Sequence, residues 1–249
     1  MRPTHTALPV LGAALLGTVA GCYGNAPTVF PDGCGPFEDT NEATLPAAVP
    51  GDPCPEQLVM ARQTWTDPDT GTRIPSVHAR ACIHVPLADV WPAIRDPQTG
   101  RDPTTTQDFT VVGYEVAPIY DFSYRTHVTV NTTLGITPIF DLEWRHCLVT
   151  GTLDAPTLVS GRWRKIDGTT AIALLEGSIV ARPFDGDPSI TEIQYQYHLN
   201  AQFSGYGTIE AYLGVIYGRL VERSHRRPLV PDNCTMCPTP PADYCPCFP

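Results

Sequence analysis

The cysteines are the side chains of this sequence with the clearest chemistry. The 249-residue chain has nine of them. Cys22 directly follows an apolar segment, and the other eight form an even set, which in an exported protein predicts up to four disulfides. Spacing alone leaves their pairing open. The eight are Cys34, Cys54, Cys82, Cys147, Cys234, Cys237, Cys245 and Cys247.

The last four cysteines lie close together in a proline-rich stretch, CTMCPTPPADYCPC. A CxxC pair followed by a CxC pair could close tetrahedrally around zinc. Because an oxidising compartment competes for the same thiols, we favour disulfides and predict no metal site. A thioredoxin-like role for Cys234 and Cys237 is disfavoured too, since that chemistry needs the pair at a helix N-terminus.

His146 is the histidine best placed for acid–base chemistry, because it shares a strand face with apolar residues. A buried imidazole beside a carboxylate can act as a general base. Glu143 falls on the opposite face of the same predicted strand, so His146 has no local partner. Buried polar groups normally find a structural hydrogen bond, and we therefore predict a structural His146, with catalysis as the alternative.

Signatures of the common enzyme classes are absent from the sequence. It contains no GxSxG, no HExxH and no glycine-rich phosphate loop, and no close pair of acidic residues falls on one strand face. We therefore predict no cofactor and favour a protein without catalysis. The formal net charge of -10 and the single lysine argue against nucleic acid as a partner.

The N-terminal residues read as a targeting segment. A basic start at Arg2 is followed by an apolar run from Ala7 to Ala20, which is too short to span a bilayer comfortably. A signal peptide over residues 1–21 is the better interpretation.

The end of this segment, Val19-Ala20-Gly21-Cys22, resembles the bacterial lipobox. The resemblance implies cleavage before Cys22 and attachment of lipid to its thiol, which would anchor the protein to a membrane of the cell envelope. Tyr23, where an Asp would favour the inner membrane, makes the outer membrane the expected location. The alternative is an ordinary secretory signal with Cys22 in a disulfide.

Composition divides the remaining chain into three parts. Residues 22–72 are rich in Pro, Gly, Asp and Thr without a sustained period, which predicts an extended tether, pinned to the domain by disulfides of Cys34 and Cys54. Residues 227–249 form a second irregular segment, a Pro- and Cys-rich tail. Residues 73–226 between them have the periodic patterns of one ordered domain.

The ordered part predicts a strand, a short helix, six strands and a final helix. HARACIHV alternates apolar and polar residues, and PLADVWPAIRD places Leu87, Val90, Trp91 and Ile94 at helical spacing, with Pro92 shortening or bending the helix. Turn signals separate the strands that follow, which indicates an antiparallel sheet. We predict these strands over 109–116, 122–130, 139–150, 158–166, 171–182 and 191–203.

The end of the domain has the strongest patterns. From Ile193 to Phe203 every odd position is apolar or aromatic and every even position polar, which predicts a strand with one wet face. Ile209, Leu213, Ile216 and Leu220 then recur on one side of a helix.

Two of these stretches, HVPLADVWPAIRDP and YQYHLNAQFSGYGTIEAYLGVIYGRLVERSH, resemble the opening and closing elements of the START-like superfamily, also called SRPBCC or helix-grip. The resemblance implies an α+β fold in which a curved antiparallel sheet wraps around a long C-terminal helix. A lipocalin-like β-barrel is the alternative architecture.

In that superfamily a cavity between sheet and helix holds an apolar molecule, which implies a hydrophobic small molecule or lipid as the ligand here. The residues expected to face it are Tyr124, Trp144, His146, Tyr195, Tyr197 and Leu213. The competing hypothesis is that these residues fill a closed core, so that the protein is a structural or interaction lipoprotein with a disulfide-stapled tail. A cyclase- or hydrolase-like enzyme is the third.

Overall fold

We describe the fold from a computed structural model, which covers part of the chain. The predicted signal peptide, Cys22 and the four tail cysteines lie outside the residues that it describes. Those residues are 30–37, 51, 54–68, 70–114, 120–132, 137–185, 187–202, 204–227 and 229.

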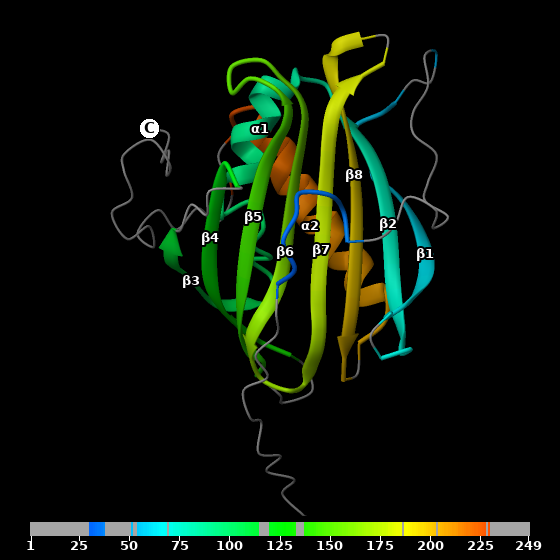
Figure 1. Ribbon diagram of the computed structural model, residues 1–249, viewed down its shortest axis with the longest axis vertical. Coiled ribbons are helices and arrows are strands. Elements are labelled where there is room, and N and C mark those ends of the chain that lie inside the picture. Colours follow the sequence, from blue (N-terminus) through cyan, green and yellow to red (C-terminus); the bar gives the residue numbers. More distant parts are fainter. Residues whose placement is uncertain are drawn as a thin grey trace, which may run out of the picture.

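Strands and helices follow one another along this part of the chain in the predicted order, preceded by one additional strand (Figure 1). They are β1 (Val59–Thr66), β2 (Arg73–Ile83), α1 (Leu87–Arg95), β3 (Thr106–Tyr114), β4 (Phe122–Val130), β5 (Ile139–Gly151), β6 (Pro156–Gly168), β7 (Ile172–Phe184), β8 (Asp187–Ala201) and α2 (Tyr206–Ser224).

The strands form one antiparallel sheet in the order β1-β2-β8-β7-β6-β5-β4-β3. From β3 to β8 each strand pairs with the next along the chain, and β2 then pairs with β8. Within the described residues, β1 and β3 end the sheet without pairing to each other. The predicted helix-grip fold is confirmed, and the lipocalin-like barrel is wrong, because this sheet is open.

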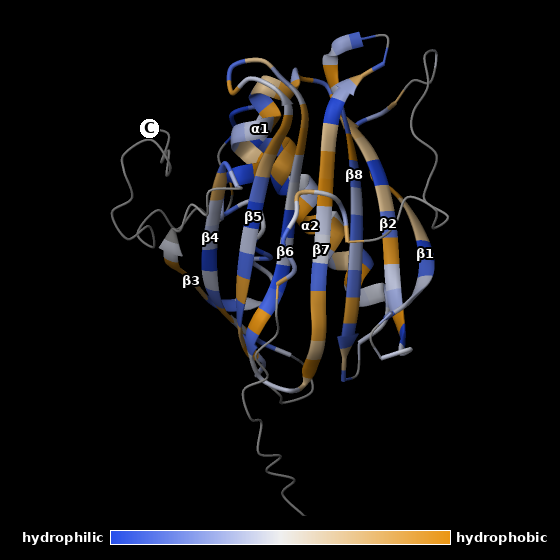
Figure 2. Ribbon diagram, in the orientation of Figure 1, coloured by the Kyte–Doolittle hydropathy of each residue, from blue (hydrophilic) through white to orange (hydrophobic). Residues whose placement is uncertain are grey.

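The sheet curves around α2, which crosses its concave face (Figure 1). Apolar and polar bands alternate along β5, β7 and β8 (Figure 2), because successive side chains point to opposite faces. The predicted apolar positions of β8 and α2 are buried in one core. They include Ile193, Tyr195, Tyr197 and Leu199 from the strand, and Ile209, Leu213, Ile216 and Leu220 from the helix.

α1 is a short helix that closes one end of the core. Pro86 caps it, and Pro92 lies inside its nine residues. Leu87, Val90 and Trp91 are buried against the core, as their helical spacing predicts.

β1 lies in the segment 22–72, for which the sequence predicted only an extended tether. It is an edge strand that pairs with β2 alone. None of its residues is fully buried. An edge strand exposed in this way carries little of the apolar alternation by which strands are recognised.

A second part of the predicted tether, residues 30–37, lies across the convex face of the sheet and is called the strap here (Figure 1). Cys34 of the strap forms a disulfide with Cys147 of β5. Cys54, just before β1, forms another with Cys82 of β2. Four of the eight predicted disulfide cysteines are thus paired.

Neither helix of the described residues is both long and apolar enough to cross a bilayer.

Candidate functional site

A small cavity lies between the concave face of the sheet and α2. Its volume is about 30 Å³. A water molecule occupies about the same volume in the liquid, whereas sites for drug-sized ligands have several hundred Å³. The cavity is lined by Ile94, Thr99, Gly100, Trp144, His146, Gly161, Trp163, Ile179, Tyr195, Ile216 and Leu220.

Aromatic rings from neighbouring strands form one wall of this cavity. Trp144 and Trp163 are directly opposite each other on β5 and β6, and their rings stack with centroids 5.1 Å apart. Tyr124 of β4 stacks on Trp144 at 5.7 Å and on His146 at 5.6 Å. The result is a row of stacked rings across three strands, of which Trp144, His146 and Trp163 line the cavity. Large aromatic side chains of this kind bind apolar groups.

Glycines make room for these rings. A methyl group at Gly177 would overlap the Trp163 ring, and one at Gly100 would lie 2.6 Å from Cη2 of Trp144. At Gly161 it would lie 3.1 Å from Cδ2 of His146. Each ring therefore occupies space that any residue with a Cβ would fill.

Three polar atoms of residues lining the cavity have no hydrogen-bond partner among the described residues. They are the hydroxyl oxygen of Thr99, Nδ1 of His146 and the indole Nε1 of Trp163. All three residues are more than nine-tenths buried. A buried polar group without a partner costs about 1–3 kcal/mol, so these atoms favour a hydrogen-bonding guest in the cavity.

His146 is fully buried and lies on the cavity wall. Desolvation, and the charge of Arg95, lower its pKa to about 3, although hydrogen bonding to the backbone of Phe122 and Ile94 acts in the opposite direction. The imidazole is therefore neutral near pH 7. Glu143, on the opposite face, binds Arg125 and Arg145 instead.

The cavity is closed on one side by residues 96–102, the cavity loop, which is the first part of the connection from α1 to β3. Three side chains of α2 hold it. Arg223 Nε donates to Asp96 at 2.6 Å, Arg219 Nε to the carbonyl of Gln98 at 2.9 Å, and the Tyr212 hydroxyl to the carbonyl of Gly100 at 2.8 Å. These donors are seven and four residues apart and so share one side of α2.

The six predicted ligand-binding residues are all buried, but they do not share one surface. Trp144, His146 and Tyr195 line the cavity. Tyr124 lies behind Trp144, and Leu213 belongs to the surrounding core. Tyr197 packs between Trp163 and Tyr212 at 5.9 and 5.3 Å.

Trp163 and Thr99 line the cavity although the sequence did not single them out. Trp163 has an alternating strand pattern around it, but only its register opposite Trp144 places it at the site. Thr99 lies in the cavity loop, where no periodic pattern could indicate which way it faces.

A second buried polar cluster lies on the convex face. Nδ1 of His198 is 2.8 Å from Glu176, and Nε of Arg164 lies 3.3 Å from the same carboxylate. Trp65 of β1 stacks on the His198 ring with centroids 4.4 Å apart. The even face of β8, predicted to be wet, is therefore covered at His198 by the additional strand.

Comparison with known proteins gave matches to structures only. No protein-family model and no curated protein matches the sequence. The lipid transfer and protein localization domain of human StarD13 is 10% identical, with a TM-score of 0.47 over 75% of this chain and 89% of that one. An aromatase/cyclase from Streptomyces is 11% identical, with a TM-score of 0.43 over 61% and 94%. A Thermus thermophilus protein is 16% identical, with a TM-score of 0.45 over 61% and 98%.

Proposed function

We propose that this protein is a bacterial cell-envelope lipoprotein, anchored through Cys22, whose helix-grip domain binds a hydrophobic small molecule between the sheet and α2. The outer membrane is the proposed location. We propose binding without catalysis, because His146 is neutral near pH 7 and its Nδ1 has no hydrogen-bond partner among the described residues.

The observation that carries the binding proposal is the combination of apolar walls with three unpartnered polar atoms. The Trp163 indole can only donate, while the Thr99 hydroxyl and a neutral His146 nitrogen can donate or accept, the latter according to its tautomer. A ligand that fits them has an apolar body and an oxygen that accepts from Trp163. This chemistry describes an aromatic or polycyclic molecule with a hydroxyl or carbonyl group.

The volume of the cavity sets a condition on binding. About 30 Å³ admits only one small group of such a ligand, so its body needs additional space. The cavity loop is the element that can provide this space, because side-chain hydrogen bonds from α2 hold it in place. We propose that the loop opens when the ligand binds.

The same small volume favours a second candidate function, an interaction lipoprotein with a filled core. In that case ordered water in the cavity would satisfy the unpartnered atoms of Thr99, His146 and Trp163. The two candidates differ in a measurable way, because only the first needs an organic molecule in the cavity.

Native mass spectrometry of the purified full-length protein tests the binding proposal. We expect a co-purifying organic molecule that is absent from an Ile179→Phe variant, in which the larger side chain fills the cavity. Val149→Phe is the matched control, because Val149 is exposed on β5. Purified protein without any such molecule, and without binding to a panel of polycyclic phenols and ketones, would favour the filled-core candidate.

The anchor is tested separately. We expect the mass of the intact membrane-extracted protein to show acyl chains on Cys22 and no residues before it. Cys22→Ser should abolish the acyl chains and release the protein from membranes. A wild-type protein that keeps Cys22 in a disulfide would contradict the anchor and leave the binding proposal unaffected.

A further inference from the structure

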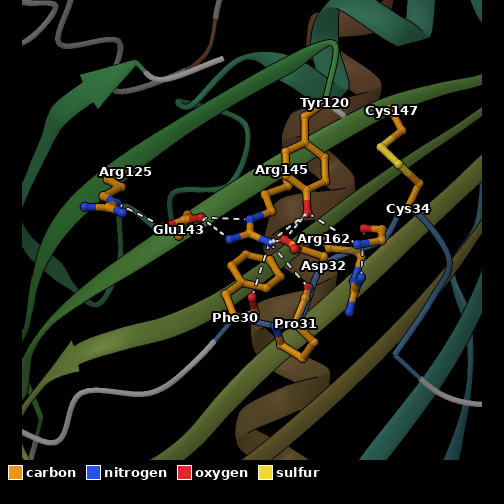
Figure 3. Close-up of polar contacts among 11 residues, drawn as sticks. Phe30, Pro31, Asp32, Cys34, Tyr120, Arg125, Glu143, Arg145, Cys147 and Arg162 are labelled. Carbon is orange, nitrogen blue, oxygen red and sulfur yellow. Dashed lines mark hydrogen bonds and ion pairs between the residues drawn. A yellow bond between two sulfur atoms is a disulfide. The ribbon is translucent and has the colours of Figure 1, made fainter. Parts of the chain in front are cut away.

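The strap fixes the chain to the middle of the convex face. Its disulfide joins Cys34 to Cys147, and the guanidinium groups of Arg145 and Arg162 lie 4.0 Å from the ring centroids of Phe30 and Phe37, respectively. Figure 3 shows Phe30, the Cys34–Cys147 disulfide, Arg145 and Arg162 on the side of the sheet away from α2.

Polar contacts hold the strap between these points. Arg145 donates to the carbonyls of Phe30 and Pro31 and to the carboxylate of Asp32 (Figure 3). Arg162 donates to the carbonyl of Gly33 at 2.8 Å. The chain is therefore held to the sheet from its first described residue.

This attachment shortens the connection to the proposed lipid. Only seven residues lie between Cys22 and Phe30, and the eight steps from one to the other span at most about 29 Å when the chain is fully extended. Without the strap, the next fixed point would be Cys54, which forms a disulfide with Cys82. Cys54 is 32 residues beyond Cys22, so the fully extended chain between them could span about 115 Å.

A short connection of this kind limits how the domain can face the membrane. If α2 faced the lipid, the segment between Cys22 and Phe30 would have to run around the edge of the sheet. It would first cross β4 and β3, about 10 Å, and then pass the thickness of the sheet and of the helix layer, about 20 Å more. That path uses its entire extended length, which has a high cost in conformational entropy. A domain whose convex face lies toward the membrane imposes no such cost.

We propose that the strap holds the convex face of the sheet toward the anchoring membrane, so that α2 and the cavity loop face away from it. This inference rests on the proposed lipid anchor and goes beyond it. Its consequence is that the cavity receives its ligand from the aqueous side or from a partner there, and not from the membrane to which the protein is attached.

Energy transfer to the membrane surface tests this orientation. The full-length lipidated protein carries one fluorescent non-natural amino acid, either at Ile139, exposed on the face of β5 that also carries Glu143 and Arg145, or at Ala211, exposed on α2. The protein is reconstituted into vesicles of phosphatidylethanolamine and phosphatidylglycerol with a headgroup-labelled acceptor lipid. We expect higher transfer from position 139 than from position 211.

A longer tether provides the matched comparison. Insertion of about 30 Gly and Ser residues after Asn25 leaves the strap and domain unchanged but removes the length limit. We expect the difference between the two positions to be lost in this variant.

Equal transfer from both positions with the native tether, or higher transfer from position 211, would overturn the orientation. Intact masses without acyl chains would instead overturn the anchor, and with it this inference. The ligand measurements above do not depend on either result.

Discussion

His146 makes the stability of the domain sensitive to mild acid. Burial lowers the pKa of the folded imidazole from 6.5 to about 3, so the unfolded chain binds a proton below pH 6.5 that the folded chain does not. The contribution of neutral, buried His146 to the free energy of unfolding is thus fully present above pH 6.5. It is lost progressively as the pH falls toward 3.

Replacement of this imidazole by a neutral amide should remove that sensitivity. Between pH 6.5 and 5, we expect the wild-type unfolding free energy to fall by roughly 2 kcal/mol more than that of His146→Gln, at 1.36 kcal/mol per pH unit. Urea denaturation at several pH values measures this difference. Parallel pH profiles for the two proteins would show that His146 titrates normally.

The glycine beneath Trp163 should be intolerant of a methyl group. We expect Gly177→Ala to lower the unfolding free energy by roughly 1–3 kcal/mol, because the indole ring must move within a packed core. Gly218→Ala is the matched control: its methyl meets open space within α2 and should stabilise by about 0.5–1 kcal/mol. Thermal denaturation compares the stabilities of the two variants. If Gly177→Ala were as stable as Gly218→Ala, the packing argument would be contradicted.

At the scale of elements, the cavity loop depends on α2 for its position. Tyr212→Phe removes one hydrogen bond to the loop, worth about 1 kcal/mol, so we expect roughly fivefold faster hydrogen exchange at the amides of Thr99 and Arg101. Tyr217→Phe is the control, since its hydroxyl binds the carbonyl of Cys82 in β2 instead. Unchanged exchange at the loop amides in Tyr212→Phe would show that other contacts hold the loop.

The sequence predicted most elements because their patterns are local. The alternation of Ile193 to Leu199 and the helical spacing of Ile209 to Leu220 each fall within one element and report one buried face. β1 escaped prediction because half-buried edge residues show little alternation. The strap has no period, and what holds it is a disulfide to Cys147 and two arginines, all far from it in the sequence.

The candidate site could be predicted only in part, for a similar reason. Trp144, His146 and Tyr195 were identified from the faces of their own strands. Trp163 needed the register between β5 and β6, and Thr99 needed the path of a loop. Both depend on contacts between segments far apart in the sequence, which local patterns do not contain.

On the scale of the whole molecule, the two disulfides should differ in their effect on stability. Their cysteines are 113 and 28 residues apart, and the longer loop restricts the unfolded chain more. We expect replacement of Cys34 and Cys147 by Ser to lower the free energy of unfolding by about 4–5 kcal/mol. Replacement of Cys54 and Cys82 should lower it by about 3–4 kcal/mol. Chemical denaturation of the two double variants tests this order, and the reverse order would show that the strap adds little.

The pairing of β2 with β8 has a consequence for how the chain folds. β3 to β8 can assemble as successive hairpins, each closing a short loop, whereas β2 must wait for a partner that begins more than 100 residues later. Contacts of such long sequence separation form slowly. Chain synthesis must therefore reach β8 before the N-terminal strands can complete the sheet, and until then the free edge of β2 is the part of the molecule most open to pairing with another chain.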